Sequence, residues 1–177
     1  KSLRIFPNII FGLTLVLVFF LPLVTWQGFL FPSTFPKTIF LFILVELMFI
    51  LWVADIRQCL HAWWKRPLFL AVFSFFIAAF LSSLLGADFY QSVWSNYERM
   101  MGLWALGHVI LFFLITATAL RHMEQWTWIF RALGASALIV SIIGIFEFFK
   151  AGGAVRAEAT LNNSAFLASY LFLSSFV

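Results

Sequence analysis

The feature that most constrains this chain is a series of long apolar blocks, each of about 17–22 residues, separated by short stretches that hold most of the charges. A helix rises about 1.5 Å per residue, so a block of about 20 residues crosses a bilayer core about 30 Å thick. Hydrophobic residues make up 64% of the 177 residues and charged residues 10%. A soluble domain has about 45–50% apolar and about 25% charged residues. The pattern therefore predicts a polytopic membrane protein.

We predict an all-α fold, a polytopic transmembrane helix bundle with about five complete spans and the start of a sixth. The predicted spans are 6–24, 38–54, 67–85, 103–120, 132–149 and a sixth from 164 onward. Residues 1–177 are expected to form a single transmembrane domain. The first residue is Lys1 rather than methionine, and the last residues, LFLSSFV, end within an apolar run. We therefore expect the chain to be the N-terminal part of a longer multi-span protein.

The Lys and Arg residues are distributed unevenly between the two sides of these spans. With the N-terminus in the cytoplasm, seven of the 11 lie in cytoplasmic segments, and the four in outer loops are Lys37, Arg99, Lys150 and Arg156. Cytoplasmic loops carry an excess of Lys and Arg, so the N-terminus is predicted to be cytoplasmic. The net charge of +4 thus reflects membrane-flanking loops, and no nucleic-acid partner is expected.

Two predicted outer loops each carry an arginine near the end of a span: Arg99 in SVWSNYERMMG and Arg156 in RAEATLNN. The planar guanidinium group suits phosphate because it donates several hydrogen bonds in a fixed fork. Thr160, Asn162 and Asn163 precede the sixth span and are of the types that cap helix N-termini, where anions are attracted. This pattern predicts a phosphate site at the outer face. Alternatively, both arginines are interface anchors and the asparagines only cap a helix.

Three ionisable residues lie within or close to the apolar blocks: Glu46 in the second, His108 in the fourth and Glu147 near the outer end of the fifth. An ionisable group at membrane depth is a functional candidate by default. The structural alternatives are pairing of Glu46 inside the bundle, snorkelling of Glu147 and a hydrogen-bonded core position for His108. The sequence contains no metal-ligand spacing and no glycine-rich phosphate loop with a lysine, so neither metal nor cofactor is predicted.

The two outer loops resemble the O-antigen ligase and O-antigen polymerase family of bacterial envelope glycosyltransferases. In the first loop the resemblance rests on a Trp, a short spacer, an Arg and a Gly, which are Trp94, Arg99 and Gly102. The second loop, RAEATLNNSAFLASYL, is similar to a family pattern through Arg156, Thr160, Asn163, Leu167, Ala168 and Tyr170. It departs from that pattern at Asn162, where glycine is usual, and at Ser164, where many members have proline. The resemblance covers residues 85–177.

The resemblance implies a multi-pass protein of the bacterial inner (plasma) membrane that transfers or polymerises glycans from an undecaprenyl-pyrophosphate carrier at the outer face. Its partners would be the carrier-linked glycan, a glycan or lipid acceptor and membrane lipids, with no cofactor. The implied pyrophosphate-binding residues are Arg99 and Arg156, supported by Thr160, Asn162 and Asn163. The catalytic base, a histidine of a large outer loop, is expected beyond Val177, and residues 1–177 alone are therefore expected to be inactive.

Two other functions stay open. A polytopic membrane transporter or flippase subunit would depend on Glu46 and His108 rather than on the outer arginines, although the chain has no clear internal repeat of the kind many transporters have. A non-catalytic membrane scaffold would depend on neither. A large outer loop with a histidine and further arginines, following residue 177, would favour the transferase. Ligase and polymerase, the sugar and the acceptor are not distinguished by this sequence.

Overall fold

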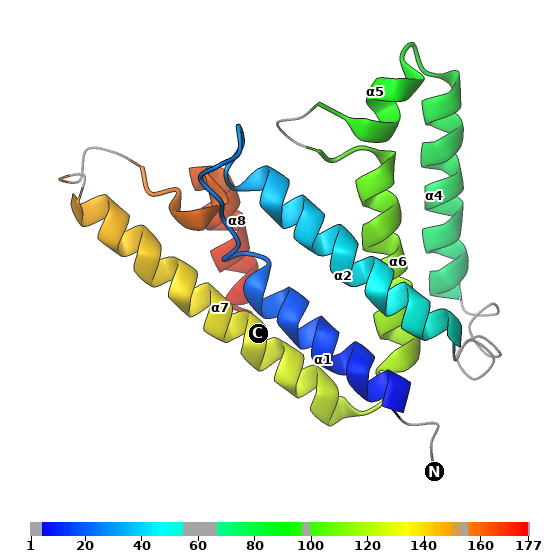
Figure 1. Ribbon diagram of the computed structural model, residues 1–177, viewed down its shortest axis with the longest axis horizontal. Helices are drawn as coiled ribbons and strands as arrows, with labels where there is room; N and C mark the ends of the chain where they lie inside the picture. Colours follow the sequence, from blue (N-terminus) through cyan, green and yellow to red (C-terminus); the bar gives the residue numbers. More distant parts are fainter. Residues whose placement is uncertain (1–4, 55–66, 97–99, 151, 153–155, 177) are drawn as a thin grey trace. The chain divides into compact units, whose positions relative to one another are not determined.

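The computed structural model describes residues 5–54, 67–96, 100–150, 152 and 156–176. Over these residues the regular structure is all helical, with seven α-helices and a short 3-10 helix, η2 (Figure 1). The elements are α1 (Ile5–Phe20), α2 (Thr34–Ala54), α4 (Pro67–Leu85), α5 (Phe89–Trp94), α6 (Leu103–Ala119), α7 (Met123–Lys150), η2 (Ala159–Leu161) and α8 (Ser164–Ser174). The predicted all-α fold is confirmed for this part of the chain.

Three of these helices, α2, α4 and α7, are long and apolar enough to cross a membrane. Helices α1, α6 and α8 are apolar but shorter. In α4, Phe69 is the buried residue, while large side chains such as Phe75 and Leu81 are exposed. An apolar helix that buries so little of its own surface needs lipid or further protein around it, so the helices are those of a membrane protein.

Several helix boundaries differ from the predicted spans. Helix α7 begins at Met123 rather than at 132, so the prediction of a linker over 121–131 was wrong from Met123 onward. The start is fixed by a cap, because the His122 backbone N–H donates to Gln125 Oε1 over 3.2 Å. Glu124 in the first turn and Lys150 in the last turn also match the helix dipole. Helix α1 ends at Phe20 rather than at 24, and α2 begins at Thr34 rather than at 38.

The chain divides into two compact units, of which the first comprises residues 1–13 and 41–121. Its core contains Ile10, Met48, Trp52, Ile115 and Ala119, drawn from α1, α2 and α6. Trp52 Nε1 donates a hydrogen bond of 2.7 Å to Thr118 Oγ1, so the indole N–H is satisfied inside the apolar core. Helix α6 also packs against α4 and α5.

The turn between α5 and α6 requires a glycine. Before the turn, Asp88 caps the start of α5 by accepting a 2.9 Å hydrogen bond from the Gln91 backbone N–H. At the end of the turn, Gly102 is the N-cap of α6, and a Cβ atom placed on it would lie 2.2 Å from the Val93 carbonyl oxygen. Contact that close is forbidden for backbone, so this position of the first resembling loop accepts only glycine without a shift of the chain.

The second unit comprises residues 14–40 and 122–177, in which α8 and η2 pack against α7. Ser136 and Val140 of α7 and Leu167 of α8 are buried. Tyr170 Oη donates a 3.1 Å hydrogen bond to Ser136 Oγ, which joins α8 to α7 by a polar contact. A hydrogen bond between apolar helices contributes about 1 kcal/mol on average, so this contact stabilises the pair only modestly. It also fixes the register of α8 against α7.

Candidate functional site

The segment with the strongest family resemblance forms a loop, residues 156–163, that leads into α8 and is called here the Arg156 loop. Arg156 is exposed at its start, and η2 forms its middle. Asn162 adopts the left-handed conformation (φ 55°, ψ 22°), which asparagine and glycine tolerate better than other residues. Asn163 is the N-cap of α8, and its side chain accepts a 2.8 Å hydrogen bond from the Ala165 N–H. The asparagine at position 162 therefore provides the turn for which glycine is usual.

One end of this loop is held by Glu147, near the end of α7. Its Oε2 atom accepts two backbone hydrogen bonds, of 2.9 Å from the Glu158 N–H and 2.6 Å from the Ala159 N–H. Charge-assisted bonds of this kind are stronger than those between neutral groups. The carboxylate thus pairs two backbone donors, and it fixes the chain shortly after Arg156.

The middle of the loop is held by Thr160. Its hydroxyl donates a 2.7 Å hydrogen bond to the Pro22 carbonyl oxygen, in the segment between α1 and α2. Its own carbonyl oxygen accepts a hydrogen bond from Lys37 Nζ, in the first turns of α2. All three residues belong to the second unit. The Arg156 loop is consequently fixed to the start of α2 as well as to α7.

The predicted site residues have different outcomes. Arg156, Thr160, Asn162 and Asn163 lie in one loop, but Thr160 and Asn163 use their side chains for internal hydrogen bonds. Their observed roles are to shape the loop and cap α8. Arg99, the second predicted phosphate ligand, lies outside the described residues.

Two residues that hold the loop, Lys37 and Glu147, were not predicted to do so. Lys37 was counted only as an outer basic residue, and Glu147 was a functional candidate whose structural alternative was snorkelling. The one usable signal was that both belong to the same predicted outer side as Arg156.

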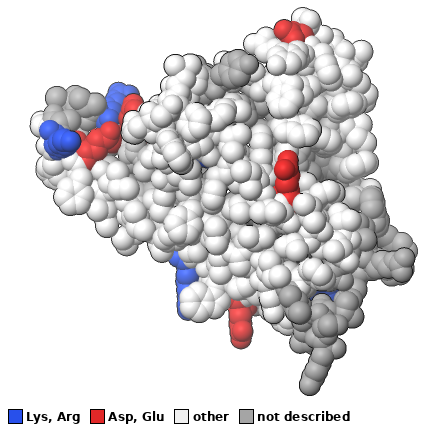
Figure 2. Space-filling model, in the orientation of Figure 1, with Lys and Arg blue, Asp and Glu red and all other residues white. Residues whose placement is uncertain are grey.

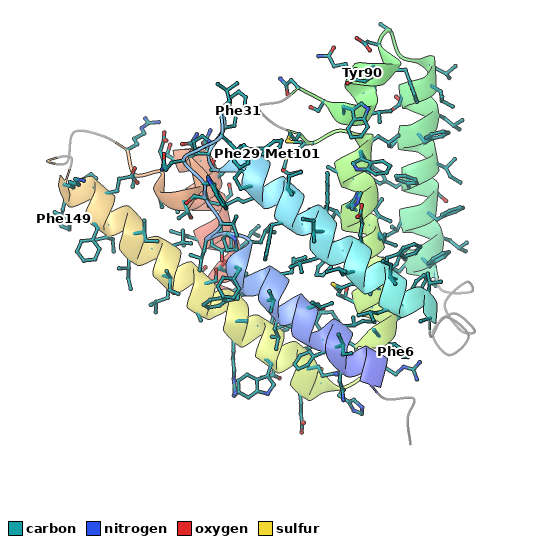
Figure 3. All side chains as sticks on the ribbon, viewed as in Figure 1. Phe6, Phe29, Phe31, Tyr90, Met101 and Phe149 are labelled. Atoms are coloured by element: carbon teal, nitrogen blue, oxygen red, sulfur yellow. The ribbon has the colours of Figure 1, made fainter. Side chains whose placement is uncertain are left out.

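An apolar groove lies between α7 and α8, next to the Arg156 loop. Its volume is about 590 Å³. The residues that line it are Ser141, Gly144, Ile145, Phe148, Phe149, Ala157, Leu167 and Leu171. Phe149 projects from the end of α7 (Figure 3), and Ala157 directly follows Arg156 in the chain. The groove therefore opens beside the segment that carries the arginine.

Gly144 lines this groove and contributes no side chain to it. A Cβ atom at this position would lie 3.5 Å from Leu167 Cδ2 and 3.7 Å from the Ala159 Cβ, which is ordinary contact. Alanine would therefore fit, whereas any longer side chain would extend toward α8 or into the groove. The hydrogen at position 144 is what leaves space between the two helices.

Charged groups of the second unit gather at the end of α7 and in the loop that follows. Figure 2 shows blue and red atoms together there, at the left of the view, while most of the visible face is neutral. Glu147, Lys150 and Arg156 are exposed in this region. Apolar residues thus line the groove, while basic and acidic side chains lie together at the end of α7 and in the loop that follows.

A second polar cluster lies in the first unit, between α2 and α6. The His108 side chain is 8% exposed, and its Nε2 atom lies 3.5 Å from Glu46 Oε1, whose side chain is 60% exposed. His108 Nδ1 lies 2.9 Å from the Trp104 carbonyl oxygen. The Phe42 ring lies 4.1 Å from the imidazole ring, centroid to centroid, with an interplanar angle of 30°. The expected hydrogen-bonded position of His108 is confirmed, and Glu46 is its partner.

In the described ranges no three His, Cys, Asp or Glu side chains come close enough together to hold a metal ion. Among the described groups that could contact a ligand are exposed Arg156 and the Glu46–His108 pair, whereas the Lys37 ammonium already donates to the Thr160 carbonyl oxygen. Comparison of this chain with protein-family models, with curated proteins and with solved structures found no match.

Proposed function

We propose that this chain belongs to a lipid-linked glycan transferase of the bacterial inner membrane, similar to the O-antigen ligase and polymerase family. In this proposal the Arg156 loop and the groove beside it bind an undecaprenyl-pyrophosphate carrier. The observation that carries the proposal is that Ala157, next to Arg156, lines an apolar groove of about 590 Å³. A cation and an apolar groove side by side match the two halves of a polyprenyl pyrophosphate.

The chemistry of glycan transfer explains why a fixed arginine is useful. When the sugar leaves its carrier, negative charge develops on the pyrophosphate oxygens. Donors that are already in position stabilise that charge without reorganising during the reaction. The hydrogen bonds from Glu158 and Ala159 to Glu147, and from Thr160 to Pro22, hold the backbone beside Arg156 in one conformation. The loop therefore has the rigidity that a pyrophosphate clamp needs.

The groove supplies the other half of the interaction. An isoprenoid chain gains about 0.8 kcal/mol for each CH₂ group that it buries. Side chains from α7 and α8, including Ile145, Phe148 and Leu167, would contact the first isoprene units of the tail. Because these helices are themselves apolar, the rest of the tail would continue into lipid.

The membrane topology is part of the proposal. We propose that α1 and α6 cross the membrane together with α2, α4 and α7, which makes five spans, and that α8 begins a sixth. Helices of 16 and 17 residues reach about 24–26 Å, and local thinning of the bilayer accommodates a shortfall of a few ångströms. With the N-terminus in the cytoplasm, the Arg156 loop faces the outer side, where the carrier-linked glycan and its acceptor would meet. The catalytic base would come from a segment outside this chain.

Substitution of Arg156 tests the proposal. In the protein that contains this chain, reconstituted in lipid vesicles, transfer from undecaprenyl-pyrophosphate-linked glycan is measured per folded molecule. Arg156→Ala should reduce transfer about tenfold to a hundredfold, since a charge-assisted hydrogen bond contributes about 1.5–3 kcal/mol and about 1.4 kcal/mol is tenfold. The family resemblance predicts the same reduction in transfer for Arg99→Ala. Arg156→Lys should restore little, because an ammonium lacks the bidentate fork.

Arg131, an exposed arginine near the other end of α7, provides the matched control. Arg131→Ala also removes one positive charge, from α7, and should leave transfer unchanged. Full activity of Arg156→Lys, or a loss in Arg156→Ala that only follows the amount of folded protein, would overturn the pyrophosphate assignment. Either result would make Arg156 an interface anchor.

A second candidate function is that of a transporter or flippase subunit, and the Glu46–His108 pair favours it. Ionisable pairs within spans mark many proton and substrate pathways. The two functions respond to different substitutions. A transporter would lose movement of its substrate across vesicle membranes in Glu46→Gln and keep it in Arg156→Ala. A transferase would show the reverse pattern for glycan transfer.

A further inference from the structure

The arrangement of His108 between α6 and α2 fixes where its hydrogens lie. The Trp104 carbonyl oxygen, 2.9 Å from His108 Nδ1, can only accept a hydrogen bond. His108 Nδ1 must therefore carry a hydrogen. This assignment leaves Nε2 as the ring atom that changes its protonation, and Nε2 is the atom that faces Glu46 Oε1 at 3.5 Å (α2 and α6 in Figure 1).

A hydrogen bond between His108 Nε2 and Glu46 Oε1 then requires one proton between these two atoms. If His108 were neutral and Glu46 ionised, Nε2 and Oε1 would face each other with lone pairs and would repel. One proton removes the conflict, either as a carboxylic acid that donates to Nε2 or as an imidazolium that donates to a carboxylate. Both forms have zero net charge, which is the least costly state in an apolar surrounding.

The described helices of the first unit carry few charged groups besides the pair. In the described part of the first unit, α4 and residues 5–13 carry no titratable side chain, and α6 carries only His108. Helix α5 and its cap contribute Asp88 and Tyr90, and Arg121 follows the end of α6, about three turns beyond His108. Glu46 is the one charged residue of α2 beyond Lys37. The proton between Glu46 and His108 therefore has no alternative ionic partner on these helices.

The two members of the pair differ in access. The His108 side chain is 8% exposed and lies against the rings of Phe42 and Trp104, at centroid distances of 4.1 and 5.1 Å. The Glu46 side chain is 60% exposed. An aromatic face stabilises a cation held against it, so Phe42 supports the imidazolium form. The carboxyl group is thus the exposed member of the pair, and the imidazole is the buried member.

We propose that Glu46 and His108 form a proton-exchange site within the membrane-spanning part of this chain. The site takes up one proton at the Glu46 carboxyl group, which is the exposed member of the pair. In the transfer step the O–H bond at Oε1 breaks and its electron pair stays on the oxygen, while the Nε2 lone pair forms the new N–H bond. Net charge is conserved in this step. Release of the proton leaves the pair with one negative charge and two facing lone pairs.

Loss of the proton thus changes the contact between α2 and α6 from attraction to repulsion. The site can report proton binding as a change in the packing of these helices, because the two side chains join them directly. This role is independent of the glycan-transferase proposal, since the Arg156 loop belongs to the other unit.

The test uses the protein that contains this chain in phospholipid vesicles, with spectra recorded at a series of pH values from about 4 to about 9. Infrared difference spectra follow the C=O stretch of a protonated carboxylic acid, and ¹⁵N-histidine NMR follows both imidazole nitrogens. We expect the carboxyl and Nε2 signals to change in one common transition of one proton, with Nδ1 protonated throughout. Glu46→Gln should remove the carboxyl signal, and the change at Nε2 should then follow a different pH dependence.

Two variants keep the test decisive. Glutamine at 46 has the shape of glutamate and can still donate to Nε2, so α2 and α6 should stay packed while the carboxyl signal disappears. Glu124→Gln, at an exposed glutamate of α7, should leave the common transition unchanged. Separate transitions of the two groups would overturn the proposal. A change at Nε2 that is the same in Glu46→Gln as in the unsubstituted protein would do so as well.

Discussion

Glu147 shows how much a single side chain contributes to the candidate site. It lies three residues before the end of α7, and its carboxylate binds the backbone on the far side of the intervening segment, at Glu158 and Ala159. The geometry explains why an acidic residue stands beside a proposed anion site. Its charge is used by two backbone donors, so it competes less with a phosphate for Arg156 than a free carboxylate would.

Replacement of Glu147 should loosen the Arg156 loop. Glu147→Ala removes acceptors for two backbone N–H groups, and one charge-assisted bond contributes about 1.5–3 kcal/mol. Amide hydrogen exchange at Glu158 and Ala159 should therefore become about tenfold faster or more, because about 1.4 kcal/mol corresponds to tenfold. Glu124→Ala, at the exposed start of the same helix, should not change these two amides. Unchanged exchange at 158 and 159 in Glu147→Ala would show that the loop is held by other contacts.

Single residues also show where sequence reasoning reaches its limit. The turn at Asn162 could be predicted, because asparagine tolerates left-handed angles locally. The hydrogen bond from Lys37 to Thr160 could not, since it joins residues 123 positions apart. The Glu46–His108 contact spans 62 positions. Such pairs depend on how helices pack, and helix packing leaves no periodic signal in one sequence.

At the scale of helices, each apolar helix of the described residues coincides with a predicted apolar block, and three of these helices are long enough to cross a membrane. In lipid every backbone polar group must be paired, and a helix pairs them within its own segment. Their ends were less predictable. Helix α7 extends back to Met123 through Gln125, Trp126 and Trp128, a stretch whose polarity favours a linker. The capping bond from His122 to Gln125 makes this stretch helical, and a capping residue is a weaker signal than a hydropathy block.

The spacing of α7 and α8 gives a prediction about the groove. Gly144→Ala should be tolerated and should raise helix stability by up to about 1 kcal/mol, since its Cβ meets its neighbours at 3.5 Å or more. Gly144→Phe should fill the groove and reduce transfer from undecaprenyl-pyrophosphate-linked glycan, with little change for a water-soluble pyrophosphate competitor. The competitor's inhibition constant and the amount of folded protein are measured for both variants.

The comparison of these two variants separates a binding groove from a packing defect. If α7 and α8 enclose the carrier's tail, the phenylalanine variant loses transfer while the alanine variant keeps it. If transfer is equal in both folded variants, the groove has no part in carrier binding. A matched phenylalanine substitution at Ser74, an exposed position of α4 in the other unit, should leave transfer unchanged.

For the molecule as a whole, the order of helices along the chain determines which loops share a side of the membrane. Each complete span reverses the side. With spans at α1, α2, α4, α6 and α7, the α4–α6 connection and the α7–α8 connection lie on one side, and the α6–α7 connection lies on the other. The Lys and Arg distribution, seven against four, decides which side is cytoplasmic. Topology can therefore be tested independently of how the two units pack.

Cysteine labelling in intact cells provides that test. In a Cys59→Ser background, single cysteines are introduced at the exposed residues Gln91, His122 and Lys150 and treated with a membrane-impermeant maleimide. Positions 91 and 150 should react from outside, because they lie in the α4–α6 and α7–α8 connections. Position 122, and Cys59 in the unsubstituted protein, should react only after the membrane is opened. The reverse pattern would invert the orientation, and labelling at 91 without labelling at 150 would show that α6 and α7 do not both span.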